Sequence, residues 1–209
     1  MKHCPLCNRS SDEAVFFGEF CEECARGKLM QSLPKNVEVA ECKDCKKIKL
    51  KGAFVPMSKA TMEQLLQCEY KKYNITLIHS SNGIARMCVI DERAGGVDVD
   101  LNAHIKLIRT LCDFCSKKRA SYYEAIVQLR GEEGKVGRMA EALTHYIEKN
   151  GAFITKTDQK EHGVDVYTSD KRVAQSFLSV RHLKWKGSYE LHGQKGSRKL
   201  YRNTYFVTL

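Results

Sequence analysis

Residues 97–115, VDVDLNAHIKLIRTLCDFC, join the two patterns that decide the fold of this chain. Over the first eleven of these residues apolar and polar side chains alternate, which is typical of a β-strand with one buried face. The apolar face would carry Val97, Val99, Leu101, Ala103, Ile105 and Leu107. Because the strand runs directly into Cys112 and Cys115, we expect it to deliver this Cys-x-x-Cys pair to a distant part of the chain.

Three further Cys-x-x-Cys pairs lie within the first 45 residues. Two thiolates at this spacing fill half of the shell of a tetrahedral ion, and a second pair completes it. Three pairings are possible, and the first two pairs are separated by a short loop, which costs the least entropy to close. We therefore expect two closed structural zinc sites, one made by Cys4, Cys7, Cys21 and Cys24, the other by Cys42, Cys45, Cys112 and Cys115.

The compartment favours metal sites over disulfides. The sequence has neither an apolar run long enough to span a membrane nor a signal peptide, so we expect a cytoplasmic protein without a membrane partner. A reducing compartment disfavours disulfides and leaves redox pairs or an iron cluster as the alternatives to zinc. The remaining two of the ten cysteines, Cys68 and Cys88, lie in apolar segments and are expected to act as small hydrophobic residues.

The pattern around these pairs predicts an α+β protein of two domains. Residues 1–120 would form a double zinc-knuckle region that carries a small α/β insert at about 52–111. In this insert Ser58 can cap a helix, and residues 74–79 and 84–91 resemble a hairpin. Residues 121–209 read as strand, helix, hairpin, helix and hairpin, which is a ferredoxin-like β-α-β-β-α-β sandwich with an extra strand.

Basic residues concentrate in the second half. Residues 112–209 carry 18 Lys and Arg against 11 acids, while residues 1–111 carry 17 against 14. A basic surface favours a nucleic-acid partner. The aromatic residues Trp185, Tyr189, Tyr201 and Tyr205 are interleaved with these cations, but they share a register with Leu191 and are expected to lie mostly in the core. The RNA-contact candidates are therefore Lys46, Lys47, Lys117, Lys118, Arg119, Lys184, Lys186, Lys195, Arg198, Lys199 and Arg202.

Motifs for catalysis are missing from the sequence. The segment GEEGKVGRM at residues 131–139 has Val136 where a phosphate loop needs a hydroxyl, so it predicts a turn before a helix. The histidines form no recognised metal-protease motif. We expect neither an enzyme nor a small-molecule substrate.

The chain resembles the archaeal relatives of the NMD-three family, the large-subunit export adaptors named after nonsense-mediated decay. The resemblance lies in the order of the four cysteine pairs and in three segments, LCDFC (residues 111–115), YYEAIVQLRG (122–131) and GAFITK…GVDVYTSDKRVA (151–174). The likeness covers almost the whole chain, although Ala120 and Ser121 stand where glycines are expected. It implies that the eight paired cysteines bind zinc. It also implies a non-enzymatic factor of ribosome biogenesis that binds the large ribosomal subunit during late maturation or quality control, docks on rRNA and ribosomal proteins, and approaches initiation factor six. The alternative hypothesis is a zinc-ribbon factor associated with DNA or transcription.

Overall fold

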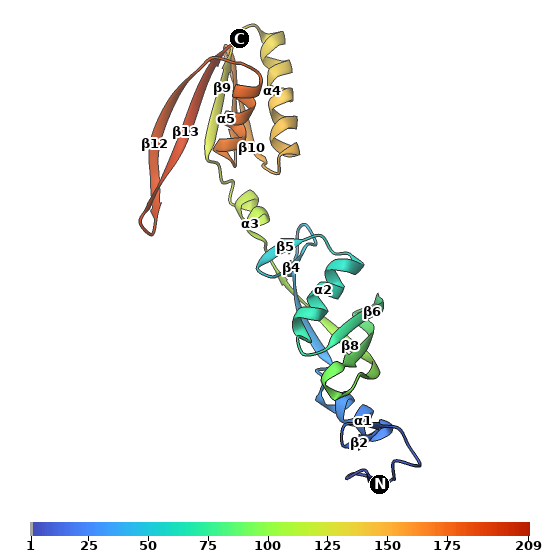
Figure 1. Ribbon diagram of the computed structural model, residues 1–209. Helices are drawn as coiled ribbons and strands as arrows, with labels where there is room; N and C mark the ends of the chain where they lie inside the picture. The colour runs from blue at the N-terminus through green and yellow to red at the C-terminus, as the bar shows by residue number, and fades with distance from the viewer. Residues whose placement is uncertain (1) are drawn as a thin grey trace. The chain divides into compact units, whose positions relative to one another are not determined.

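The computed structural model describes residues 2–209, without the side chains of Lys195 and Arg198. Contacts divide the chain into two compact units, Met1–Cys112 and Asp113–Leu209, whose elements are drawn in Figure 1. Each unit has its own hydrophobic core. Among the described residues no helix has the length and apolar character needed to cross a membrane. The α+β class expected from the sequence is confirmed.

The first unit is built on a six-stranded sheet with the strand order β5-β4-β3-β8-β7-β6. Its strands are β3 (Asn36–Cys42), β4 (Ile48–Leu50), β5 (Ala53–Val55), β6 (Asn74–Ser81), β7 (Ile84–Asp91) and β8 (Val97–Thr110). The central pair, β3 and β8, is parallel, and Cys42 lies opposite Thr110. Strand β3 was not among the strands predicted from the sequence. Its apolar and polar residues alternate all the same, and Val37 and Val39 are buried.

The insert has the expected helix and hairpin. Helix α2 (Lys59–Glu69) begins after Ser58, whose hydroxyl accepts the Thr61 N–H at 3.1 Å, while the Thr61 hydroxyl accepts the Ser58 N–H at 2.8 Å. This reciprocal capping box satisfies two N–H groups that a helix leaves unpaired. Strands β6 and β7 form the hairpin, and the short 3₁₀ helix η1 (Glu92–Ala94) leads toward β8.

Strand β8 alternates as predicted over most of its length. Val97, Val99, Leu101 and Ala103 are buried, but Leu107 is 45% exposed. The expectation that Leu107 belongs to the buried face is therefore wrong. The packed core, to which α1 (Glu22–Ser32) and α2 contribute, ends near Ile105. Pairing with β7 stops at His104, while β3 pairs with β8 as far as Thr110.

The second unit begins with the short helix α3 (Asp113–Arg119). Its further elements follow the predicted strand and helix order. They are β9 (Ala125–Arg130), α4 (Glu133–Lys149), β10 (Ile154–Lys160), β11 (Gly163–Thr168), α5 (Lys171–Val180), β12 (Trp185–Lys195) and β13 (Arg198–Thr208). Asp170 caps α5 by accepting the N–H groups of Arg172 at 2.7 Å and Val173 at 3.2 Å.

Both long helices of this unit cover one face of its sheet (Figure 1). Leu143 and Ile147 on α4 and Phe177 on α5 pack in one buried cluster with Val127 on β9 and Tyr205 on β13. The residues between these positions on the strands point to the opposite face, since side chains alternate along a strand. That second face is lined by half-buried or exposed side chains such as Gln128 and Phe206.

The extra strand lies inside the sheet rather than at its edge. The strand order is β10-β11-β9-β13-β12, and β13 pairs with β9 in parallel. Strand β12 pairs only with β13 and forms the sheet edge. Pairing with β9 covers only Asn203 to Thr208, so the rest of the β12–β13 hairpin extends past β9.

This extension corrects the prediction for the aromatic residues. Tyr205 is buried and Trp185 is partly buried, as expected for core residues. Tyr189, Leu191 and Tyr201, in contrast, are 66%, 56% and 40% exposed. Leu191 and Tyr201 face each other across the hairpin. They share the face of Tyr205, but β9 pairs with β13 only from Asn203 onward, so in the described part of the chain this third strand does not reach them.

Candidate metal centres

The structure gathers the eight paired cysteines into the two expected sets. Within each set the Sγ atoms lie within 4.8 Å of one another. The first set is Cys4, Cys7, Cys21 and Cys24, and the second is Cys42, Cys45, Cys112 and Cys115. The Cys7 and Cys21 sulfurs are 3.5 Å apart, and those of Cys45 and Cys112 are 3.7 Å apart. Zn–S bonds of about 2.3 Å in a tetrahedron separate sulfurs by about 3.8 Å. Both sets can therefore hold a metal ion, and none of the ten cysteines, all within the described range, forms a disulfide.

One half of each set is the same tight turn. At the first knuckle the Cys4 N–H donates to the Arg9 carbonyl and the Asn8 N–H donates to the Cys4 carbonyl, both at 2.8 Å. At the second knuckle the Cys42 N–H donates to the Lys47 carbonyl at 2.8 Å, and the Lys46 N–H donates to the Cys42 carbonyl at 2.9 Å.

The fifth residue of each turn adopts the left-handed conformation. Asn8 and Lys46 both have φ of 60°. Asn adopts this region readily, whereas Lys does so rarely. The turn at Cys42–Lys46 is thus strained by itself, and ligation by two of its thiolates would stabilise it.

The other half of each set is the first turn of a helix. Cys21 is the residue before α1 and Cys24 lies in its first turn, and Cys112 and Cys115 stand in the same relation to α3. Helix N-termini present unpaired N–H groups and a partial positive charge, which favour thiolates.

In the first set the backbone selects which thiol ionises first. Burial raises the pKa of the Cys4 thiol, but N–H groups of Cys21, Leu6 and Cys7 hydrogen-bond to its sulfur and lower the pKa to about 6. The Cys24 thiol has its pKa raised to about 12, chiefly because it hydrogen-bonds to Cys21 and also because of burial.

The second set has the same arrangement. The pKa of Cys42 is lowered to about 6, first by the N–H of Cys45 and, against the effect of burial, by those of Cys112 and Asp44. The Cys112 N–H lies 3.4 Å from the Cys42 sulfur. One sulfur in each set is therefore prepared as a thiolate, the form that binds metal.

The parallel pairing of β3 with β8 explains how the third pair meets the fourth. The two strands end together, and the Lys43 N–H donates to the Thr110 carbonyl at 2.9 Å just past their ends. The expectation that the long strand delivers Cys112 is confirmed. Its parallel neighbour β3, which delivers Cys42, could have been found from its alternation. Cys68 and Cys88 belong to neither set.

The RNA-contact candidates near the second knuckle are all on the surface. Lys46 and Lys47 are exposed in the turn, and Lys117, Lys118 and Arg119 form the exposed last turn of α3. The Lys117 ammonium lies 4.7 Å from the Tyr122 ring centre and 3.9 Å from the Glu124 carboxylate.

The candidates on the last hairpin differ in how accessible they are. Lys186 and Lys199 are exposed, whereas Arg202 is half-buried with its guanidinium carbon 4.0 Å from the Tyr123 ring centre. The side chains of Lys195 and Arg198 lie outside the described residues.

Lys184 borders a pocket to which helix α4 adds Lys135 and Arg138. Sequence reasoning did not single out these two residues. Their i and i+3 spacing places them on one helix face, but only the fold brings that face to Lys184.

The comparisons with known proteins agree with the position of the second unit. Residues 122–209 match the family model described as NMD3, second domain. No curated protein was found to match the chain. The match covers the carboxyl-terminal unit from just before β9 to its last strand, and NMD3 proteins are associated with ribosome biogenesis and the large ribosomal subunit. Residues 122–209 therefore carry the second domain of the NMD3 family.

Proposed function

We propose that the protein is a non-enzymatic adaptor that binds the large ribosomal subunit in the cytoplasm, during late maturation or quality control, by docking on rRNA and ribosomal proteins. The observation that carries this proposal is the match of residues 122–209 to the NMD3 second domain.

We propose zinc as the metal of both tetra-cysteine sets. Four thiolates around a closed tetrahedral position are the usual ligands of structural zinc. Such a site leaves no coordination position for substrate, so its role would be to fix the two knuckles and the helix turns. Initiation factor six is a candidate protein neighbour of the first knuckle on the subunit.

Exposed cations on the protruding hairpin support contact with RNA. Lys186 and Lys199 point into solvent, and the exposed Tyr189 and Tyr201 lie on the same hairpin. Cations that neutralise phosphates bind any RNA strand, while aromatic rings can stack on unpaired bases. An adaptor that reads a particular place on the subunit would need both kinds of contact.

The test is co-sedimentation of the zinc-loaded protein with purified large ribosomal subunits over a salt series. We expect binding near one protein per subunit that survives moderate salt. The variant Lys186→Gln/Lys199→Gln removes two hairpin charges, and it should lower the slope of log K against log salt by roughly 1.5 if each lysine contacts a phosphate.

The matched control is Lys149→Gln/Lys160→Gln, which removes two exposed charges from other elements of the same unit. It should leave the slope unchanged. Protein that stays at the top of the gradient at low salt would contradict the proposal. Equal binding to duplex DNA of similar length would favour the DNA-associated alternative instead.

A further inference from the structure

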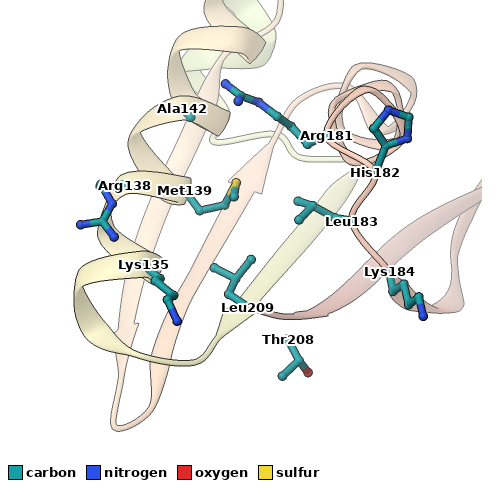
Figure 2. A pocket seen from close by; sticks show the side chains of 10 residues that line it. All are labelled: Lys135, Arg138, Met139, Ala142, Arg181, His182, Leu183, Lys184, Thr208 and Leu209. Atoms are coloured by element: carbon teal, nitrogen blue, oxygen red, sulfur yellow. The ribbon is translucent and has the colours of Figure 1, made fainter.

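A pocket of about 700 Å³ opens between α4 and the segment that follows α5 (Figure 2). Its centre is aliphatic. Met139 and Ala142 come from α4, and Leu183 and Leu209 face them (Figure 2). These four side chains are only partly buried and form the outer margin of the second hydrophobic core. The volume is in the usual range of about 300–1,000 Å³ for ligand pockets.

Basic side chains surround this apolar centre. Lys135 and Arg138 border it on the α4 side, and Arg181, His182 and Lys184 border it on the other. All five are exposed, and among the described residues that line the pocket none is acidic. The Glu132 carboxylate lies 3.1 Å from the Lys135 ammonium in an exposed ion pair, which contributes little.

The chemistry of the lining distinguishes between two kinds of ligand. Nucleic-acid bases are held by aromatic or guanidinium planes and by hydrogen bonds to their edges. In the described lining the planar groups, those of Arg138, Arg181 and His182, belong to the rim, and the aliphatic centre offers no plane on which a base could stack. Phosphates alone would pair with the rim but leave the aliphatic centre in contact with water. An aliphatic side chain flanked by carboxylates matches the centre and the rim together.

We propose that this pocket binds an amphipathic, acidic helix of a partner protein. Aliphatic residues of such a helix, spaced three and four apart, would fill the space over Met139 and Leu183. Aspartates or glutamates on both sides of the apolar stripe would then face the two basic rims, Arg138 on α4 and Arg181 after α5. This inference concerns a protein partner and does not depend on the hairpin contact to rRNA.

The probe is a fluorescein-labelled synthetic helical peptide with leucines at i, i+3, i+4 and i+7 and glutamates flanking them. We expect the full-length protein to bind it, as measured by fluorescence anisotropy. A peptide with glutamine in place of glutamate should bind about tenfold more weakly or worse, because each of several exposed ion pairs contributes a little. A uridine oligonucleotide is titrated in parallel.

Two variants test the two parts of the pocket separately. Arg138→Glu/Arg181→Glu reverses the rim charges and should weaken the glutamate peptide by at least about tenfold. Ala142→Phe fills the centre without changing charge and should weaken both peptides. The control Lys149→Glu/Lys160→Glu carries the same charge change elsewhere in the unit, and circular dichroism melts report whether each variant is folded.

Three results would overturn the inference. The glutamate peptide could bind no more tightly than the glutamine peptide. The folded rim variant could bind it as well as the parent protein. The oligonucleotide could bind more tightly than the peptide and lose its binding in Ala142→Phe, which would make the pocket an RNA site. None of these results bears on co-sedimentation with ribosomal subunits.

Discussion

Replacing Cys42 by serine tests the second metal centre directly. Cys42 is fully buried at the end of β3, and its sulfur accepts the Cys112 N–H across the parallel strand ends. A structural zinc ion contributes about 10–16 kcal/mol of apparent folding free energy in small zinc peptides. This is of the same order as the roughly 5–15 kcal/mol that stabilises a typical whole domain, but the hydrophobic core of the first unit is built from residues other than these ligands. We therefore expect Cys42→Ser to release one metal ion and to loosen the structure around the site.

The assay combines metal content with hydrogen exchange. Zinc measured by mass spectrometry after gel filtration should fall from two ions per chain to one. The amides of Lys43 and Lys46, which bond to Thr110 and Cys42 in the knuckle, should exchange faster. The β6–β7 hairpin should keep its protection, because its strands pack in the hydrophobic core and carry none of the eight paired cysteines.

Two control variants make the result interpretable. Cys4→Ser should remove the other ion and leave the exchange of the Cys42 knuckle unchanged, since Cys4 belongs to the other set. Cys68→Ala should retain both ions. Two ions retained in Cys42→Ser would refute the reasoning, and so would loss of both ions in Cys4→Ser.

Three further predictions follow from local geometry. Zinc binding near pH 7.5 should release fewer than four protons per ion, because the pKa values of Cys4 and Cys42 are lowered to about 6 and these thiols are already ionised. Calorimetry in buffers of different ionisation enthalpy measures this number, and release of four protons would contradict the assignment. The affinity for zinc should fall as the pH falls, and most steeply below about pH 6. Gly163→Ala should destabilise the second unit by more than about 2 kcal/mol in denaturant titrations, because φ of Gly163 is +155° and a Cβ would lie 2.0 Å from the Leu129 carbonyl oxygen. The control Gly137→Ala, in open space on α4, should stabilise the unit by about 0.5–1 kcal/mol, and equal effects of the two variants would be inconsistent with the geometry. Asp170→Ala should cost about 1 kcal/mol through loss of the α5 cap, measured in the same titrations, and an unchanged midpoint would show that the cap contributes nothing.

Structural features that depend on residues a few positions apart in the sequence could be predicted. The Cys-x-x-Cys spacing determines that two sulfurs reach one ion, and loop length favours the pairing that the structure has. Ser58 and Asp170 cap helices because their oxygens reach N–H groups two or three residues ahead. Alternation determines which side chains of β8 share a face. Each of these relations is set by covalent geometry over a few residues.

Features that depend on which strands pair could not be predicted in this way. The order β-α-β-β-α-β-β is compatible with β13 at the sheet edge or beside β9, and only packing in the second core places it beside β9. The same pairing stops at Asn203, which leaves Tyr189 and Tyr201 exposed although their register is that of buried Tyr205.

The sequence by itself determined the two tetra-cysteine sets, the helices α2, α4 and α5, and the face to which each residue of β8 points, because these follow from spacing along one chain segment. The tertiary structure alone decided the parallel β3–β8 pair, how far each apolar face is covered, and the basic pocket between α4 and the end of α5. The physical reason is that burial and charge clustering depend on segments many residues apart. Their contacts form only when loop closure is offset by packing.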